Sequence, residues 1–451
     1  MDDTIFALSS GPGIGGVAVL RLSGPRALST LDGLCPGKPR PDPRRATLRR
    51  LIDPDTGTRL DEALVLTFPG PHSFTGEDVV ELHVHGGRAV VEGVLATLSR
   101  QSGCRMAEPG EFSRRAFDNG RLDLTEVEGL GDLIQAQTAA QKEQALRQMD
   151  GVLRRLYEGW RERLMQALAR LEADIDFPDE DLPEGIGAAV RPELGVLRNE
   201  MARHLADGAR GRTLRDGFRI VLLGAPNAGK STLMNRLAQS DVAIVTTEAG
   251  TTRDVLDVQM DLGGYPVRLV DTAGLREGGG AVEREGIRRA RERAEQADLK
   301  LILVRADCWD AFCAGEDSET AAFIDDRSLL VVTQKDRVDV FHVEHDSPWT
   351  PSVALSAETG EGMETLQALL EARVSMMLGG AEAVPLTRQR HAQAVTDAIE
   401  HLTRFDAMAD QDPVLAAEDV RLASRALGRI TGRVGVEDML DKVFSEFCIG
   451  K

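Results

Sequence analysis

The sequence has few aromatic residues and no excess of positive charge. Aromatic residues make up 4% of the 451 residues, so the hydrophobic cores must consist mainly of Leu, Val, Ile and Ala. The formal net charge is −19, which argues against loose binding to nucleic acid or to anionic membranes. A contact with RNA would therefore need a local basic patch that acts against the overall field.

Three further signals are missing from the sequence. The five cysteines, Cys35, Cys104, Cys308, Cys313 and Cys448, form no Cys-x-x-Cys pair, and their odd number does not suit a disulfide framework, so we expect a reducing, cytoplasmic location. The acidic N-terminus lacks the basic and apolar regions of a signal peptide. No uncharged apolar stretch approaches the roughly 18 residues of a spanning helix, so we expect no membrane association.

The patterns that are present divide the chain into four regions. Residues 1–120 hold glycine-rich turns and short β-like runs, which predict a small α+β domain. Helical periodicity follows over 121–215. Alternating strands and helices, which are typical of a parallel sheet, occupy 216–376, and helical sequence returns over 377–451. This order predicts a multidomain protein in which an α/β domain is inserted into a helical domain.

The inserted region begins with a strand-like run and a glycine-rich loop. Phe218–Leu223 precedes Gly224-Ala-Pro-Asn-Ala-Gly-Lys230-Ser231, and a helical run starts at Thr232. This is the P-loop pattern in its strand–loop–helix context. Backbone N–H groups of such a loop converge on phosphate oxygens, the lysine reaches the β and γ phosphates, and the serine ligates Mg²⁺. The predicted nucleotide contacts of this loop are Asn227, Ala228, Gly229, Lys230, Ser231 and Thr232.

Further motifs follow in the order that GTP-binding proteins use. Gly250-Thr-Thr-Arg-Asp254 suits a switch loop whose Thr252 completes the Mg²⁺ shell. Asp271-Thr-Ala-Gly274 ends a strand, where a parallel sheet presents an Asp to the metal and a Gly amide to the γ-phosphate. Ser356-Ala-Glu358 suits guanine binding through backbone contacts. The predicted nucleotide contacts therefore also include Thr246, Thr247, Glu248, Ala249, Gly250, Thr251, Thr252, Asp271, Thr272, Ala273, Gly274, Ser356, Ala357 and Glu358.

The guanine-reading motif has two registers. GTPases usually carry Asn-Lys-x-Asp here, because the Asp accepts both N–H groups of guanine. After the strand Leu329–Val332 this chain has Thr333-Gln-Lys-Asp336-Arg337. The register Thr333–Asp336 supplies a carboxylate at the last position, whereas the register Gln334–Arg337 keeps a lysine and loses the carboxylate. We prefer the first register, because guanine selection needs the carboxylate, and assign Thr333 and Asp336 to the site.

The residue that orients the attacking water is not in its usual place. In small GTPases a Gln follows Asp-x-x-Gly, but here Leu275 follows Gly274. Glu283, downstream of Gly278–Gly280, is a candidate that could swing in when the loop orders. Local sequence alone favours an exposed carboxylate at the start of a helix, so both interpretations remain open.

These motifs and both flanking regions resemble those of the bacterial tRNA modification GTPases of the MnmE (TrmE) family. The likeness spans nearly the whole chain and is also carried by Gly13–Arg21, Phe74–Glu81, Pro109–Leu124 and the terminal Phe447-Cys-Ile-Gly-Lys451. The ending Cys-Ile-Gly-Lys, combined with a P-loop domain inside a helical domain, is highly specific. The resemblance implies an N-terminal α+β folate-binding domain, a helical domain and an inserted Ras-like GTPase domain.

The resemblance also implies a function. The chain would hydrolyse GTP within a complex that modifies carbon 5 of the wobble uridine, position 34, of certain tRNAs, giving an aminomethyl or carboxymethylaminomethyl group. It would form a homodimer through the N-terminal domain and a heterotetramer with a flavoprotein of the MnmG type. The one-carbon unit would come from 5-formyl- or 5,10-methylene-tetrahydrofolate. The alternative is a regulatory GTPase that binds RNA or the ribosome without modification chemistry.

The roles of individual residues in folate binding follow from the same resemblance. The folate contacts would be Arg21, Glu81, Arg121 and Lys451. Arg121 stands where a Lys is common, which keeps the charge but changes the donor geometry. Cys448 lies in a motif close to the family's folate site, and both a structural role and modification chemistry remain open.

The resemblance implies ion ligands and catalytic residues as well. K⁺ would take the place of an arginine finger, with the ligands Asn227, Thr246, Glu248 and Thr251, largely through backbone oxygens. Mg²⁺ would be held by Ser231 and Thr252. Glu283 aligns with the family's water-orienting glutamate, and Arg276 would assist in ordering the loop.

Overall fold

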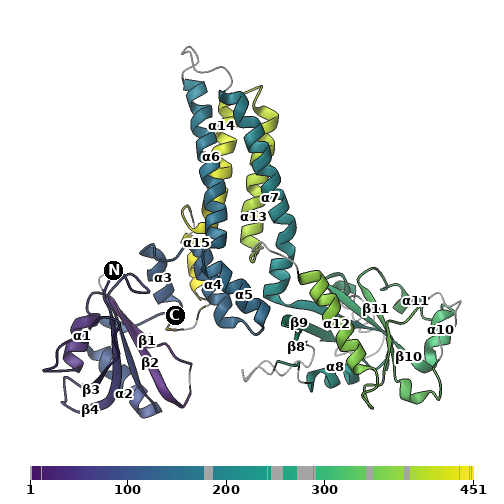
Figure 1. The fold of residues 1–451 in the computed structure, drawn as a ribbon, viewed down its shortest axis with the longest axis horizontal. Helices are drawn as coiled ribbons and strands as arrows, with labels where there is room; N and C mark the ends of the chain where they lie inside the picture. Colours follow the sequence, from purple (N-terminus) through teal and green to yellow (C-terminus); the bar gives the residue numbers. More distant parts are fainter. Residues whose placement is uncertain are drawn as a thin grey trace. The chain divides into compact units, whose positions relative to one another are not determined.

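The computed structural model describes residues 3–11, 13–176, 186–240, 242–244, 257–271, 288, 291–341, 349–379, 386–435, 437–445, 447 and 449–450. The chain divides into two compact units (Figure 1). The first unit consists of Met1–Gly131, Gln148–Gly195 and Asp397–Lys451. The second consists of Asp132–Arg147 and Val196–Thr396.

The first unit begins with a six-stranded sheet in the order β3-β4-β5-β2-β1-β6. Its strands are β1 (Thr4–Leu8), β2 (Gly15–Ser23), β3 (Thr47–Ile52), β4 (Arg59–Phe68), β5 (Val79–Gly86) and β6 (Cys104–Met106). Only β1 and β6 pair in parallel. Apolar residues alternate along β2 and β5, so one face of the sheet is buried. Helices α1 (Ala27–Leu34) and α2 (Arg88–Arg100) contribute Leu31 and Leu98 to the core on that face.

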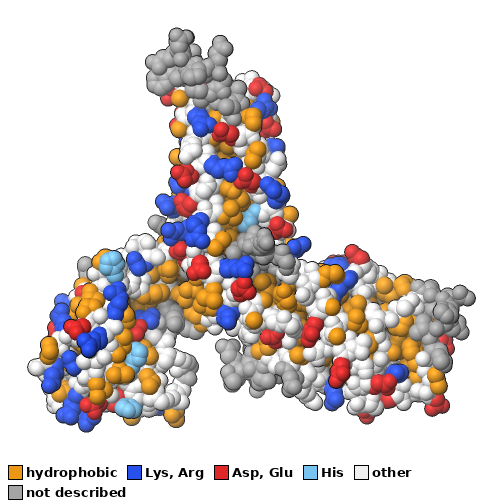
Figure 2. All heavy atoms as spheres, in the orientation of Figure 1, with side chains coloured by type: hydrophobic (Ala, Val, Ile, Leu, Met, Phe, Trp, Pro, Cys, Tyr) orange, Lys and Arg blue, Asp and Glu red, His pale blue; other side chains and the backbone are white. Residues whose placement is uncertain are grey.

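Helices make up the rest of the first unit. Helix α3 (Glu111–Asp118) follows the sheet, and α6 (Val152–Asp176) packs along α14 (Pro413–Thr431). Helix α15 (Glu437–Ser445) also belongs to the first unit. Four further helices have residues in both units: α4 (Leu124–Gln135), α5 (Ala139–Met149), α7 (Ile186–Asp216) and α13 (Gln389–Met408). On the visible face of these helices, Figure 2 shows basic and acidic side chains intermixed.

The second unit contains a six-stranded sheet in the order β12-β11-β10-β7-β9-β8. Its strands are β7 (Phe218–Leu223), β8 (Asp257–Leu262), β9 (Tyr265–Asp271), β10 (Leu299–Arg305), β11 (Ser328–Thr333) and β12 (Val353–Ala354). Only β8 and β9 pair antiparallel. Alternate residues of β7 enter two different cores, Ile220 and Leu222 in one, Val221 and Leu223 in the other. Burial on both faces explains why central strands of a parallel sheet are continuously apolar.

Helices cover this second sheet and connect its strands. They are α8 (Lys230–Ala238), α10 (Trp309–Cys313), α11 (Ser318–Ala321) and α12 (Met363–Leu378). Helix α7 ends at Asp216, directly before β7, and α13 begins at Gln389, after α12. The predicted fold class, an α+β domain followed by a helical domain with an inserted α/β domain, is confirmed. None of the helices in the described ranges is long and apolar enough to cross a membrane.

Candidate functional site

The P-loop turns the chain from β7 into α8. Gly224 has a φ of +143°, and a Cβ there would come within 2.3 Å of the Leu303 carbonyl oxygen, so only glycine fits. Gly229 caps α8 in the left-handed conformation, and Lys230 is its first residue. The Lys230 Nζ donates hydrogen bonds to the carbonyls of Gly224 (2.7 Å) and Ala225 (2.8 Å). The lysine side chain therefore folds back over the start of the loop. The loop itself ends at the N-terminus of α8, and such a helix end favours the binding of phosphate.

Two predicted metal-site residues meet beside this loop. The Ser231 Oγ donates a hydrogen bond to Asp271 Oδ2 at 2.9 Å. They meet because Asp271 ends β9, which pairs with β7 in register Leu222 to Asp271. A hydroxyl and a carboxylate are oxygen ligands of the kind that Mg²⁺ takes. In the described part of the chain no group of three or more His, Cys, Asp or Glu could hold a metal. By their chemistry, Ser231 and Asp271 fit a Mg²⁺ that also uses phosphate oxygens.

The predicted guanine-reading segment is anchored to the P-loop. The Thr333 Oγ1 is buried at the end of β11 and donates to the Ala228 carbonyl at 2.7 Å. The Gln334 Nε2 donates to the Asn227 carbonyl at 2.9 Å. Asp336 follows on a short 3-10 helix, Lys335–Arg337, and is exposed. The structure thus brings the end of β11 to the loop that begins at β7.

The last predicted motif reaches the same place through β12. Ser356 is fully buried, and its N–H donates to the Glu361 carbonyl at 2.9 Å. The Lys335 Nζ pairs with Glu361 Oε1 at 2.5 Å, and the Lys335 N–H donates to the Leu355 carbonyl at 3.1 Å. Ala357 is half-buried and Glu358 is exposed beside them. The loops after β11 and β12 are therefore held together where a base would be read.

One residue that contacts the end of β9, beside the P-loop, was not predicted from the sequence. Arg293 donates from Nη1 to the Asp271 carbonyl at 2.9 Å. Its place in a helical, charge-rich run gave no signal that it reaches β9. The other predicted contacts of this region lie outside the described residues: Thr246, Thr247, Glu248, Ala249, Gly250, Thr251, Thr252, Thr272, Ala273, Gly274, Arg276 and Glu283.

A second candidate site lies on the sheet of the N-terminal domain, on the face opposite α1 and α2. Arg21 on β2 and Glu81 on β5 are register partners, and Arg21 Nη2 pairs with Glu81 Oε1 at 2.9 Å. The Arg21 guanidinium also lies over the rings of Phe74 (5.5 Å) and Phe112 (5.8 Å), a cation–π arrangement. His83 Nε2 approaches the other carboxylate oxygen of Glu81 at 3.3 Å.

Arg121 and the C-terminal segment lie on the same domain. Arg121 is exposed just after α3, and a Cβ placed on Gly76 would come within 3.3 Å of its Cγ. Ile449 forms an antiparallel bridge with Pro109, and Ser9 Oγ donates to the Gly450 carbonyl at 3.0 Å. The chain's last described residues therefore contact the end of β1 and the approach to α3. Cys448 and Lys451 themselves are outside the described residues.

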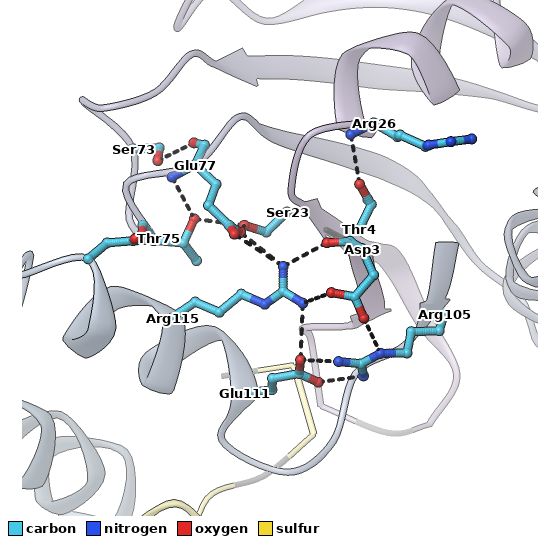
Figure 3. A network of polar contacts seen from close by, with 11 residues as sticks. Asp3, Thr4, Ser23, Arg26, Ser73, Thr75, Glu77, Arg105, Glu111 and Arg115 are labelled. Atoms are coloured by element: carbon cyan, nitrogen blue, oxygen red, sulfur yellow. Dashed lines mark hydrogen bonds and ion pairs between the residues drawn. The ribbon is translucent and has the colours of Figure 1, made fainter. Parts of the chain in front are cut away.

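A buried polar network, not predicted from the sequence, supports this second site (Figure 3). Arg115 on α3 has no exposed side-chain surface. Its Nη2 donates to Asp3 Oδ1 (2.8 Å) and to Glu111 Oε1 (3.1 Å), and its Nη1 donates to the Asp3 carbonyl (2.9 Å) and to both Glu77 oxygens (3.2 Å). Complete burial of a guanidinium is tolerated only with this degree of pairing.

Arg105 on β6 gives the network its second cation. It donates to Asp3 Oδ2 at 2.5 Å and to the Glu111 oxygens at 2.8 and 2.5 Å. Burial acts to raise the pKa of Asp3 and of Glu111, but hydrogen bonds and charge from the two arginines outweigh it and hold each pKa below its usual value. These carboxylates are therefore ionised at neutral pH and bind both arginines in place.

Comparison with known proteins identifies the family. The family model "MnmE helical domain" matches residues 124–448, and the model "GTP-binding protein TrmE N-terminus" matches residues 4–121. A "tRNA modification GTPase MnmE" from Parvibaculum lavamentivorans is 52% identical over 452 residues, and the one from Paramagnetospirillum magneticum is 51% identical over 451, each covering 100% of both chains.

A likeness to solved structures is weaker. Aquifex aeolicus Era bound to GDP and AlF4⁻ is 21% identical, with a TM-score of 0.27, and covers 41% of this chain and 66% of its own. That score is too low to add to the assignment, which rests on the full-length relatives and on the two family models. The chain belongs to the family of the tRNA modification GTPase MnmE.

Proposed function

We propose that this GTPase works in the complex that modifies carbon 5 of the wobble uridine of certain tRNAs, with a tetrahydrofolate as the one-carbon donor and an MnmG-type flavoprotein as partner. The observation that carries the proposal is the contact of Ile449 and Gly450 with the N-terminal domain. It places Ile449 and Gly450, the two described residues of the Cys-Ile-Gly-Lys ending, on the domain that holds Arg21 and Glu81. A regulatory GTPase without modification chemistry does not need this arrangement.

The residues of the nucleotide site support GTP hydrolysis, and each would have its own role. Lys230 would hold the β and γ phosphates, and Ser231 and Asp271, which are joined by a hydrogen bond, would hold Mg²⁺. Mg²⁺ would neutralise charge that develops on the phosphates. Asp336 would accept the guanine N–H groups, and Thr333 anchors its strand to the loop.

K⁺ binding is the second part of the nucleotide proposal. Asn227 has a positive φ of 61° and accepts from Gln334 through its carbonyl, so its backbone is fixed at the loop. Asn227 would contribute to a K⁺ site completed by the loop that contains Thr246, Glu248 and Thr251. Hydrolysis should then be stimulated strongly by K⁺ and little by Na⁺, and equal rates in the two salts would exclude this assignment.

The N-terminal site supports folate binding through complementary charge. A folate carries a glutamate tail, which suits Arg21, Arg121 and Lys451, and a pterin-like ring whose N–H groups suit the carboxylate of Glu81. The guanidinium of Arg21 already lies over two aromatic rings. This fixed position lowers the conformational entropy that the side chain loses on binding.

The same face of the sheet supports a homodimer. Leu48 on β3 and Leu64 on β4 are direct register partners, with 58% and 45% of their surfaces exposed. Exposed apolar neighbours on a sheet face favour contact with another protein surface. A second copy of the same domain would cover this face with two-fold symmetry.

The direct test is mass analysis of wobble nucleosides in tRNA from cells that lack this chain. We expect the carbon-5-modified uridine to disappear and to return when the wild-type chain is supplied. A regulatory GTPase would leave the modified nucleoside in place, so an unchanged nucleoside profile would contradict the proposed function.

A further inference from the structure

Arg115 is the most deeply buried charged residue of the network in Figure 3. Its neighbour on α3, Arg114, is 42% exposed and pairs with Asp441 on α15 at 2.9 Å. The two arginines are adjacent in sequence, yet one lies at the surface and the other inside. Arg115 therefore has a role that a surface charge on this helix does not share.

Arg115 connects α3 to the loop of residues 73–77. Its Nη1 contacts both carboxylate oxygens of Glu77 at 3.2 Å. Among the residues that the structure describes, Arg115 is the only Lys or Arg paired with Glu77. Asp3 and Glu111, in contrast, also pair with Arg105. Loss of Arg115 would thus leave Glu77, and not the other two carboxylates, without a cation.

Further hydrogen bonds hold the loop of residues 73–77. They depend on the loop's position against α3, which is also the position in which Glu77 pairs with Arg115. The Ser23 Oγ donates to Glu77 Oε2 at 2.6 Å and lies 2.7 Å from Thr75 Oγ1. The Asn119 Nδ2 donates to the Thr75 carbonyl at 2.7 Å. Ser23 and Thr75 are fully buried, so the polar atoms of this loop have little water available as a substitute partner.

The two elements that Arg115 joins each contribute one of the aromatic rings that Arg21 lies over. Phe74 comes from the loop and Phe112 comes from α3, and the Arg21 guanidinium lies over both rings. Gly76 of the same loop lies against the stem of Arg121. A shift of the loop away from α3 would move one of the two rings that hold Arg21 and would remove the support of Arg121.

We infer that Arg115 is a positioning residue, which holds the loop of residues 73–77 against α3 and thereby places Arg21 and Arg121 to bind an anionic ligand. The inference rests on the proposed function in one respect, because the ligand it names is the tetrahydrofolate. It adds a residue to that site which makes no contact with the ligand. Two measurements separate the positioning role from the identity of the ligand.

The first measurement needs no ligand. Hydrogen–deuterium exchange of the full-length protein would compare wild type, Arg115→Gln and the matched control Arg114→Gln. We expect exchange over residues 73–77 to rise about tenfold in Arg115→Gln, because a buried pair is broken, and to stay unchanged in Arg114→Gln. Equal protection of this loop in all three proteins would overturn the inference.

The second measurement separates positioning from stability. Arg115→Gln should lower the thermal midpoint and weaken binding of 5-formyltetrahydrofolate in calorimetry about tenfold. Adding Glu77→Gln removes the uncompensated charge, so the double variant should regain most of the thermal midpoint. Its folate affinity should stay low, because the tether between loop and helix is still missing. Recovery of affinity together with stability would show a structural role only and would overturn the inference.

A milder variant covers the case in which Arg115→Gln does not fold. Glu77→Gln alone leaves Arg115 paired with Asp3 and Glu111, and should raise loop exchange and weaken folate binding by a few-fold. Wild-type exchange and wild-type affinity in this variant would overturn the inference. If wild type itself binds no folate, the proposed function fails, while the exchange comparison still decides the role of Arg115.

Discussion

The two candidate sites are built in different ways. The nucleotide site is assembled from short contiguous motifs, each at the carboxyl end of a parallel strand, and its Lys230 is held by carbonyls five and six residues away. The N-terminal site is assembled from residues scattered over the domain, with Arg115 paired to Asp3 across 112 positions. The nucleotide site at the carboxyl ends of the strands is therefore built from residues close together in sequence. The site on the face of the N-terminal sheet depends instead on a buried network of residues far apart in sequence, which holds its side chains.

This difference implies that each site can be disabled without disturbing the other. The largest expected effect is in the nucleotide site. We propose that Glu283 orients the attacking water, so Glu283→Ala should keep nucleotide binding and lose GTP turnover about 100-fold. Steady-state hydrolysis with nucleotide affinity measured in parallel checks this, and folate binding should be unaffected. A wild-type rate would remove Glu283 from catalysis.

The next effect concerns base recognition. Asp336→Asn should weaken GTP binding roughly 100-fold, because an amide cannot accept both guanine N–H groups in place of a carboxylate. It should also favour xanthosine triphosphate, whose base offers an oxygen where guanine offers an amino group. Arg337→Gln is the matched control from the other register. A loss of GTP affinity in the control and not in Asp336→Asn would establish the register Gln334–Arg337.

A smaller effect is expected at the end of the chain. Deletion of Lys451 should weaken binding of 5-formyltetrahydrofolate about tenfold, equivalent to about 1.4 kcal/mol, while GTP turnover stays at the wild-type level. The reason is that Ile449 and Gly450, which precede Lys451 in the chain, contact the N-terminal domain. Calorimetry decides the point, and an unchanged affinity would take Lys451 out of the site.

The last effect is on stability and involves Asp123, which caps α4. Its Oδ1 accepts from the Glu126 N–H at 2.8 Å, while its Oδ2 is buried without a partner among the described residues. Burial raises the pKa of Asp123 to about 6, although the hydrogen bonds from Glu126 and Thr125 act to lower it. A carboxyl with a raised pKa binds its proton more tightly in the folded state, so stability is highest below the unfolded pKa and falls as pH rises towards 6.

Asp123→Asn should therefore raise the free energy of unfolding at pH 7 by about 1–2 kcal/mol, because the buried carboxylate is removed. The helix cap is kept, since Asn caps helices about as well as Asp. The free energy of unfolding should also change less between pH 4 and 6, because the amide does not titrate. Thermal unfolding across this pH range measures the effect. Asp412→Asn at the cap of α14, where Leu415 N–H donates at 3.1 Å, is the matched control and should show no such gain. Equal pH profiles for wild type and Asp123→Asn would contradict the prediction.

The sequence predicted those parts of the structure that local patterns determine. The P-loop could be recognised because its glycines and Lys230 stand within a few consecutive residues between a strand and a helix. Ser231 and Asp271 could be paired in advance because parallel strands place their carboxyl ends at one edge. The alternation of strands and helices, and the insertion of this α/β region into a helical domain, followed from periodicity in the same way, whereas the order of the strands in each sheet was not predicted.

The network around Arg115 could not be predicted in this way. An arginine on a short helix is expected at the surface, and adjacent Arg114 is indeed exposed. Burial of Arg115 depends on Asp3, Glu77 and Glu111, and only the last lies within a helical turn of it. The cation–π contacts of Arg21 likewise come from Phe74 and Phe112, which are far from it in sequence.

We propose that one chain combines a GTP site with a separate N-terminal site that binds the one-carbon donor. The most direct test of this proposal is Arg21→Ala supplied to cells that lack this chain, with wobble nucleosides analysed by mass and GTP turnover measured on the purified variant. We expect wild-type GTP turnover together with loss of the carbon-5-modified uridine. Full modification by a variant that no longer binds folate would contradict the proposal.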